Sequence, residues 1–349
     1  MLARLISVRE RVFSQRHFQQ GFTLIELIVS IAVVGILIGL MLPAVSEARQ
    51  TARRMQCSSH LRQIGIGLHS YHNVHSSFPA GHLAHLERGR DGKSWGWGAL
   101  LLPYIEKQAL SQRLDTSRRS FDAIASDLAN AHLIQTSIGI YRCPSDPGDD
   151  LSHAYRSIIV SGPAASSGSS SLTQEDSHRA HIFTPPNGGG APMAIRVAKS
   201  NYVGSFGNKW KTQRYSWDSE DFEGNGLFGR NSSVRFSDVF DGSSFTLAIG
   251  ERSIRNYAAV WAGGNSWLGC GFGDNQMVIG TAFYPINDPP VSTNIDCNGR
   301  GSANFSSYHH GGANFLFADG SVHFIRQELD EVVFRNLSQR DDGKKILDF

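Results

Sequence analysis

The stretch GFTLIELIVSIAVVGILIGLMLPAV, Gly21 to Val45, is the most informative part of this 349-residue chain. Glu26 is its only charged residue. A helix from Phe22 to Val45 would extend about 36 Å, which is enough to cross the roughly 30 Å hydrocarbon core of a bilayer. Since a carboxylate inside lipid costs a few kcal/mol, Glu26 is a candidate functional residue. The stretch therefore predicts a membrane-inserted helix with one functional acid.

The order Gly21, Phe22 and Glu26, after a leader that contains four arginines, resembles the N-terminal motif of type IV pilins and pseudopilins. The resemblance implies that a prepilin peptidase of the inner membrane cuts between Gly21 and Phe22, and that Phe22 is then N-methylated. It also implies that Glu26 neutralises the N-terminal amine of a neighbouring pilin-like subunit during assembly. A buried carboxylate is tolerated when it has such a partner. A secretory signal peptide and a plain membrane anchor are the competing interpretations.

Apolar residues continue at helical spacing beyond Val45, as far as the Ser-Pro-Gly segment that begins at Ser76. We therefore expect one helix of about 50 residues, half in the membrane and half packed on a head domain. The predicted fold class is α+β and pilin-like, with an antiparallel sheet against the helix. The predicted parts are a leader (1–21), a transmembrane or filament-core segment (22–45), an amphipathic continuation (46–77) and an α+β head (78–349).

Within the head, the patterns predict a helix over 94–110 that is ended or bent at Pro103, a second helix over 116–134 and a strand over 137–142. Residues 161–194 are rich in Ser, Gly and Pro, which favours a flexible loop. Short apolar segments separated by glycine follow, and they indicate a β-rich second half.

The composition fits an exported protein. The chain has 33 Lys and Arg against 31 Asp and Glu, and removal of the leader would leave 29 against 30. A mature chain of net charge −1 has no basic surface for nucleic acid, and no nucleic-acid motif is present.

Four cysteines permit three disulfide pairings in an oxidising compartment. We expect Cys57 to pair with Cys143, which would join the helix to the head, and Cys270 to pair with Cys297 because they are close in sequence. Free buried thiols are the alternative. The spacing of the cysteines does not indicate a structural zinc site.

The segment SSYHHGGANFLFADGSVHFI, Ser306 to Ile325, predicts a hairpin with Asp319 and Gly320 in its turn. His309 precedes Asp319 by ten positions, with nine residues between them. This spacing resembles the signature of the prepilin-type processing-associated H-X9-DG group, whose head is a domain of unknown function. Further matches to that group are the segments RRMQCSSHLRQIGIGLHSYH, LLPYIE, CPSD and DGSSFTLAIGERS.

We expect His309, Asp319 and Gly320 to be structural, with Asp319 in the turn and His309 bonded to a neighbouring loop. Metal ligation with His323 and an acid–base pair are the alternatives. The metal ligands, if any, are unknown from sequence, and no cofactor is implied. Calcium in the head loops is one option, with carboxylates from Asp238, Asp241 and Glu251 or from Asp274 and Asp288. The chain has no GxSxG, HExxH or Walker motif, so we expect no enzyme and no catalytic residue.

We therefore expect a pilin-like subunit, cleaved by prepilin peptidase, with a single pass through a bacterial inner membrane. Its head would lie in the periplasm or on an envelope filament of the type IV pilus or type II secretion kind. The alternative is a membrane-anchored receptor whose head binds carbohydrate or another ligand. The aromatic residues suited to stacking on a sugar would be Trp210, Trp217, Trp261 and Trp267.

Overall fold

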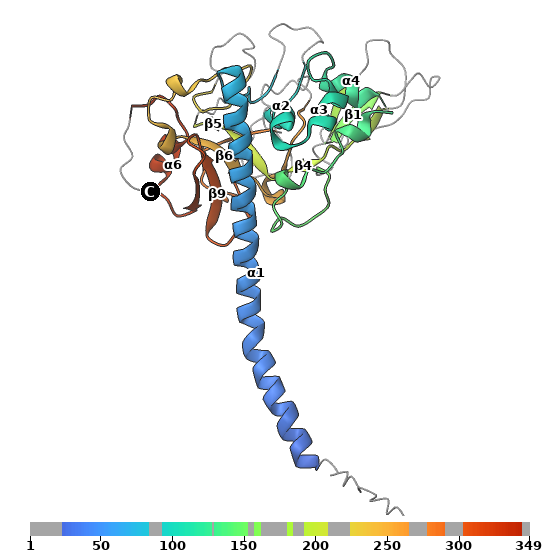
Figure 1. Ribbon diagram of the computed structural model, residues 1–349, viewed down its shortest axis with the longest axis vertical. Helices are drawn as coiled ribbons and strands as arrows, with labels where there is room; N and C mark the ends of the chain where they lie inside the picture. The colour runs from blue at the N-terminus through green and yellow to red at the C-terminus, as the bar shows by residue number, and fades with distance from the viewer. Residues whose placement is uncertain are drawn as a thin grey trace, which may run out of the picture. The chain divides into compact units, whose positions relative to one another are not determined.

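The computed structural model describes residues 23–83, 93–127, 129–152, 157–161, 180–183, 192–208, 224–264, 278–289 and 303–343. The chain divides into two compact units, residues 1–49 and residues 50–349. The helix α1 (Leu24–His75) begins in the first unit and ends in the second (Figure 1). This result confirms the predicted long helix, which continues through Pro43 without interruption.

The described part of the first unit is an exposed apolar helix. Every residue from Thr23 to Arg49 is exposed, and α1 is long and apolar enough to cross a membrane by length and composition. Thr23 and Glu26 cap its N-terminus: the Thr23 N–H donates to the Glu26 carboxylate at 2.9 Å, and the Glu26 N–H donates to Thr23 Oγ1 at 3.4 Å. This reciprocal capping explains why the helix begins at this position.

The second unit is built around a five-stranded mixed sheet in the order β10-β9-β6-β5-β8. Its strands are β5 (Tyr202–Gly207), β6 (Leu247–Glu251), β8 (Ile279–Thr281), β9 (Gly312–Phe317) and β10 (Val322–Arg326). All neighbours are antiparallel except β5 and β8. The predicted hairpin is confirmed, since β9 and β10 pair with Val322 opposite Leu316.

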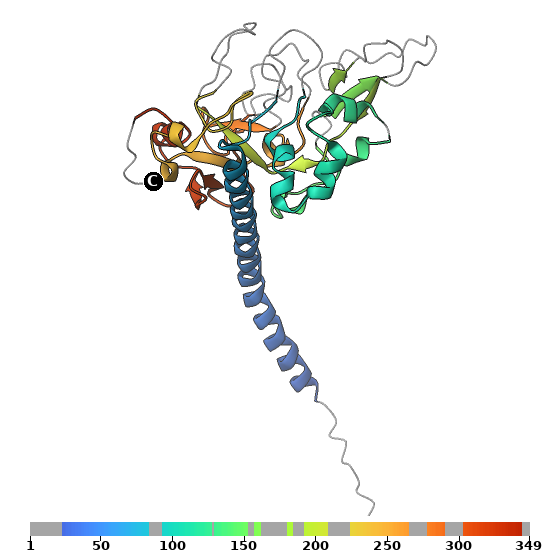
Figure 2. The same cartoon turned by 45° about the horizontal axis from the view of Figure 1, so that its top comes forward.

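The two faces of this sheet bury different helices. Residues alternate along β9, so Leu316 joins the core that contains Leu61 and Ile64 of α1, while Phe315 packs on the other face. The Phe315 ring lies 5.6 Å from the ring of Phe334 on α6 (Glu331–Leu337). The sheet is therefore covered by α1 on one face and by α6 on the other (Figures 1 and 2).

Smaller elements complete the second unit. A three-stranded sheet has the order β2-β1-β3, and β4 pairs with β7. The bounds are β1 (Ser157–Ser161), β2 (Ala180–Phe183), β3 (Pro192–Ile195), β4 (Lys199–Ser200), β7 (Ala259–Val260), α2 (Trp97–Leu100), α3 (Gln108–Leu114) and α4 (Phe121–Ser126). Short 3-10 helices are η1 (Leu102–Ile105), η2 (Ala131–Leu133), η3 (Gly139–Tyr141), η6 (Phe236–Asp238), η7 (Ser243–Phe245) and η8 (Ile254–Asn256).

Three details of the head differ from the sequence predictions. The single helix predicted over 116–134 is wrong, because α4 ends at Ser126 and only η2 follows. The strand predicted over 137–142 is wrong, because the 3-10 helix η3 occupies it and buries Tyr141. The predicted loop over 161–194 contains β2 and most of β3, and its other residues beyond Ser161 lie outside the described residues.

Close contact of α1 with the head explains two glycines in this helix. A Cβ atom on Gly67 would lie 2.8 Å from Cγ2 of Ile105, and one on Gly65 would lie 2.9 Å from Cδ1 of Leu316. These glycines lower the helix propensity of α1, but they let it approach η1 and β9 closely.

Replacement of Gly67 by leucine should therefore destabilise the head. We expect Gly67→Leu to lower the free energy of unfolding by about 1–3 kcal/mol or more, since overpacking displaces Ile105 and η1. Chemical denaturation of the detergent-solubilised chain measures this change. The matched control is Ile66→Leu, which places the same side chain at a neighbouring position that is 68% exposed and should change stability by less than about 0.5 kcal/mol. Equal stability of the two variants would contradict the packing of α1 on the head.

Candidate functional site

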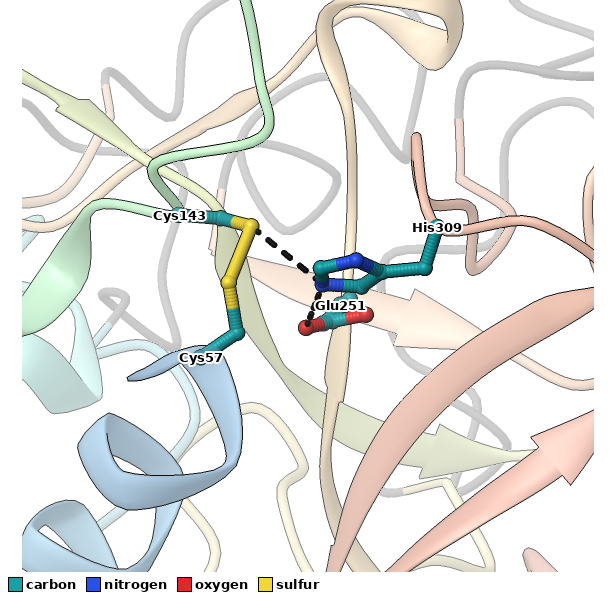
Figure 3. Close-up of side chains that lie close together, drawn as sticks. All are labelled: Cys57, Cys143, Glu251 and His309. Atoms are coloured by element: carbon teal, nitrogen blue, oxygen red, sulfur yellow. Dashed lines mark hydrogen bonds and ion pairs between the residues drawn. A yellow bond between two sulfur atoms is a disulfide. The ribbon is translucent and has the colours of Figure 1, made fainter. Parts of the chain in front are cut away.

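Four buried side chains of metal-ligating types lie close together inside the second unit. They are Cys57, Cys143, Glu251 and His309 (Figure 3). Their sulfur, nitrogen and oxygen atoms all lie within 4.8 Å of one another. Cys57 and Cys143 form a disulfide, which confirms the first predicted pairing. The predicted partners Cys270 and Cys297 lie outside the described residues. We call these four residues the Cys–Glu–His cluster.

Each member of the Cys–Glu–His cluster comes from a different element. Cys57 lies on the buried face of α1, one turn before Leu61. Cys143 follows η3, and its N–H donates to Oδ1 of Asn201 at 3.0 Å. Glu251 is the last residue of β6, and His309 precedes β9. The disulfide therefore joins α1 to the loop after η3, beside the ends of two central strands.

Hydrogen bonds from Asn314 hold the carboxylate of Glu251 in place next to His309. The backbone N–H of Asn314 donates to Oε2 at 2.9 Å, and Nδ2 of Asn314 donates to Oε1 at 2.9 Å. Oε1 then lies 3.3 Å from Nε2 of His309. These contacts satisfy a carboxylate that is only 1% exposed, as burial of a charge requires.

One nitrogen of His309 faces both the disulfide and the carboxylate. Nε2 lies 3.6 Å from Sγ of Cys143 and 3.3 Å from Oε1 of Glu251, while Nδ1 lies 3.5 Å from Oγ of Ser145. A cysteine–histidine–acid relay would use the two ring nitrogens for its two partners. Here Cys143 and Glu251 both contact the same ring nitrogen, and the two sulfurs are bonded to each other. The arrangement therefore does not match such a relay.

Two neighbouring groups add no charge to the Cys–Glu–His cluster near neutral pH. The hydroxyl of Tyr202 donates to the carbonyl oxygen of Cys57 at 3.3 Å, and burial raises the Tyr202 pKa well above its usual value. Nδ1 of His60 contacts the carbonyl oxygen of Arg142 at 2.9 Å, and burial lowers the pKa of His60.

A buried ion pair orders the loop that carries Cys143. Nζ of Lys199 lies 2.8 Å from Oδ2 of Asp146, and both side chains are almost fully buried. Asp146 also accepts hydrogen bonds from Nδ2 of Asn201 and from the N–H of Ile254, each at 2.8 Å. The CPSD segment, Cys143–Asp146, is thereby attached to β4 and to the loop after β6.

The signature residues lie at opposite ends of β9. His309 precedes the strand, whereas Asp319 follows it and accepts the N–H of Ser321 at 2.8 Å. Gly320 has a φ of +89°, which agrees with its predicted turn position. Six strand residues extend about 18 Å, so an acid–base pair between His309 and Asp319 is contradicted.

The other predicted ligand sets do not converge either. The His323 ring contacts Oγ of Ser321 at 3.2 Å within the hairpin, away from the partners of His309. Asp238 accepts the N–H of Arg235, and Asp241 accepts the N–H groups of Asp342 and Gly343. Among the described residues, these carboxylates form no common group with Glu251 or Asp288, and Asp274 lies outside that set.

A cavity of about 600 Å³ borders the Cys–Glu–His cluster at His309. His309 and Ser145 line it together with Arg53, Arg255 and Tyr308, and the remaining lining residues are Gln50, Asn287, Ser307, His310, Gly311 and Gln327. The guanidinium of Arg255 stacks 4.1 Å from the centre of the Tyr308 ring. The cavity is therefore polar and opens on His309. Of the tryptophans proposed for sugar stacking, Trp261 is buried at 1% exposure, and the others lie outside the described residues.

Sequence reasoning did not identify the cluster as a whole. It paired Cys57 with Cys143 and singled out His309, but it placed Glu251 only among carboxylates for calcium. A signal was present in LAIGER, 247–252, where an apolar strand ends in two charged residues. Charged residues directly after a buried strand need partners, which is the pattern seen here.

Comparisons with known families agree with the N-terminal helix and the head. The model of the prokaryotic N-terminal methylation motif matches residues 16–42, a range that includes Gly21, Phe22 and Glu26. This motif implies processing by prepilin peptidase, and with the long helix it defines a type IV pilin-like protein of the cell envelope. Gly21 and Phe22 themselves lie outside the described residues.

A second family model, whose description is a protein of unknown function (DUF1559), matches residues 46–332. Because this match covers most of the chain, the protein belongs to the DUF1559 family. Comparison with curated proteins finds no match, and neither does comparison with solved structures.

Loss of the buried carboxylate of Asp146 should destabilise the loop that carries Cys143. We expect Asp146→Asn to lower the free energy of unfolding by about 3–5 kcal/mol, since Lys199 would keep a buried charge without its counter-charge. The control is Asp149→Asn in the same loop, where the carboxylate pairs with Arg196 at an exposed position and its loss should cost less than about 1 kcal/mol. Denaturant titration measures the free energy of unfolding of both variants. Similar losses would contradict a larger contribution of the buried Lys199–Asp146 pair.

Proposed function

We propose that this pilin-like protein is a subunit of an envelope filament of the type IV pilus or type II secretion kind. The leader is removed, α1 anchors the chain by a single pass in a bacterial inner membrane, and the head lies in the periplasm or on the filament. The observation that supports this proposal most directly is the exposed apolar helix of the first unit, which carries Glu26 near its N-terminus.

The exposed helix needs a partner surface. Large apolar side chains such as Ile25, Leu40 and Leu42 are between 66% and 70% exposed. A continuous apolar surface of this kind is stable when lipid or other apolar helices cover it. Before assembly the bilayer supplies that cover, and in a filament the helices of neighbouring subunits supply it.

Glu26 supplies the specificity of this packing. The side chain of Glu26 accepts hydrogen bonds from the N–H and from Oγ1 of Thr23, at 2.9 Å and 2.7 Å. Both donors are neutral, so they do not neutralise the carboxylate. When lipid surrounds it, a cation is still needed to stabilise its charge. The α-amine that cleavage creates on Phe22 of a neighbouring subunit is that cation.

The proposed role involves no catalysis by the head. Both cysteines of the Cys–Glu–His cluster are bonded to each other, and His309 faces them and Glu251 through one nitrogen. These features support a structural cluster rather than a nucleophile with its base.

A receptor role for the head is the second candidate, and the cavity favours it. Its volume of about 600 Å³ is in the range of small-molecule sites, and hydrogen-bonding side chains line it. The two roles differ in how the helices associate. Single cysteines placed from Ile28 to Leu40 should crosslink into ladders of multimers in a filament, whereas a receptor would give monomers.

Cleavage at the predicted position is the first test. Mass analysis of the N-terminus from membrane fractions should find a chain that starts at N-methylated Phe22. We expect Gly21→Val to leave the leader attached, because a branched side chain would block approach of the scissile bond to the peptidase. The control Gly39→Val introduces the same change inside the helix and should be cut normally. A mature chain that begins at any residue other than Phe22 would rule out processing by a prepilin peptidase.

Removal of the Glu26 charge tests assembly. We expect Glu26→Ala to keep cleavage but to reduce filament yield at least about tenfold, since the neighbouring amine would lose a partner worth several kcal/mol. Glu26→Gln should behave similarly, because it can keep a hydrogen bond with Thr23 but not the charge. Glu47→Ala, which removes the next acid along α1, should leave the yield unchanged. Quantification of sheared filaments measures these yields, and normal assembly by Glu26→Ala would refute the role of this residue.

A further inference from the structure

We propose that the Cys–Glu–His cluster binds one Zn²⁺ ion when the disulfide is reduced, with four protein ligands. The ligand atoms are the sulfurs of Cys57 and Cys143, Nε2 of His309 and Oε1 of Glu251. The head then has two exclusive states, one held by the disulfide and the other by the metal ion.

The contacts of His309 already have the lengths that a tetrahedral zinc site needs. With zinc bonds of about 2.3 Å to sulfur and about 2.0–2.2 Å to nitrogen or oxygen, the tetrahedral edges are about 3.6 Å for S–N and about 3.4 Å for N–O. The observed distances from Nε2 are 3.6 Å to Sγ of Cys143 and 3.3 Å to Oε1 of Glu251. The edge between two thiolates would be about 3.8 Å, so it forms only when no covalent bond joins the sulfurs.

The surrounding hydrogen bonds hold the ligands in place. Asn314 donates to both oxygens of Glu251, and Oγ of Ser145 lies beside Nδ1 of His309, which leaves Nε2 directed at the sulfurs. Partners of this kind orient zinc ligands, and their loss typically weakens metal binding by about 10–100-fold. In Figure 3 the disulfide and the carboxylate of Glu251 both lie near the Nε2 end of the imidazole, and the four donor atoms all lie within 4.8 Å of one another.

The donor set selects the class of metal ion. Two thiolates and an imidazole are ligands for zinc and similar ions of borderline softness, and they exclude calcium and magnesium, which take oxygen ligands. Four protein ligands leave no open position for substrate, so the site is structural rather than catalytic. The cavity that His309 lines brings solvent next to one of the four ligand residues.

The two states interconvert by a balanced exchange. A dithiol reductant gives two electrons and two protons to the Cys57–Cys143 bond and is itself oxidised to a disulfide. The two thiols then lose their protons as Zn²⁺ binds both thiolates. In either state α1 stays joined to the loop after η3, and the metal ion also joins it to β6 and to the segment before β9.

The test compares one polypeptide in two redox states. The full chain, with Cys270→Ser and Cys297→Ser to remove other thiols, is synthesised in detergent micelles with Zn²⁺, either under a dithiol reductant or under oxidising conditions. We expect one tightly held zinc ion per reduced chain and none at this site in the oxidised chain, by metal analysis after gel filtration. Replacement of zinc by Co²⁺ should give the charge-transfer absorption of cobalt–thiolate bonds only in the reduced chain.

Variants show which residues hold the ion. His309→Ala should weaken zinc binding by more than about 100-fold, since loss of a ligand exceeds the roughly 10–100-fold cost of losing an outer partner. The matched control His310→Ala changes the next residue, which lines the cavity but lies outside the cluster, and it should bind zinc normally. The cobalt measurement uses a chain in which all four cluster residues are intact. The absence of a cobalt–thiolate band from that chain in its reduced state would overturn the proposal. Zinc binding by His309→Ala that equals that of His310→Ala would also overturn it. Neither result depends on filament assembly, so the proposed function is tested separately.

Discussion

The rest of the structure depends on a change of surroundings along one helix. Every described residue of α1 is exposed as far as Gln56, and Cys57 is the first buried one. Through the apolar segment of the first unit the large apolar side chains of the helix are exposed, so this segment needs a covering surface. From Cys57 onward, one face packs against the head through Leu61, Ile64 and Leu68. The disulfide of Cys57 lies where the head begins to supply the partner surface, and it fixes that position on the helix.

The H-X9-DG signature has a physical explanation in the way β9 is attached to α1. At one end of the strand, His309 contacts Sγ of Cys143, which is bonded to Cys57 of α1. At the other end, the carbonyl oxygen of Ala318 contacts Nε2 of His69 of α1 at 3.0 Å, just before the Asp319–Gly320 turn. The residues between them alternate between two cores. The spacing of nine residues therefore reflects the length of a central strand and its two connections, rather than a pair of residues that act together.

Local patterns in the sequence were enough to predict α1, the β9–β10 hairpin and the turn at Asp319–Gly320, because each depends on residues that are close in the chain. The strand predicted over 137–142 failed because Tyr141 is buried through a 3-10 turn, where its hydroxyl donates to the carbonyl oxygen of Gly98. The contact between Glu251 and His309 could not be predicted from sequence patterns, for a different reason. It requires β6 and β9 to be neighbours in the sheet, and sequence patterns do not give strand order.

Stability alone does not explain why a glutamate and a histidine occupy this buried position. Replacing a buried ion pair with apolar residues of similar size is often neutral or stabilising, and the disulfide already joins α1 to the head. A buried Glu–His pair with its own supporting hydrogen bonds therefore needs a reason other than stability, such as the binding of an ion by its nitrogen and oxygen atoms. Their use as metal ligands gives each of the four residues a role, and it leaves the same contacts in place when the disulfide forms. The disulfide and the proposed zinc ion thus act on the same contact, the one that holds α1 against the rest of the head.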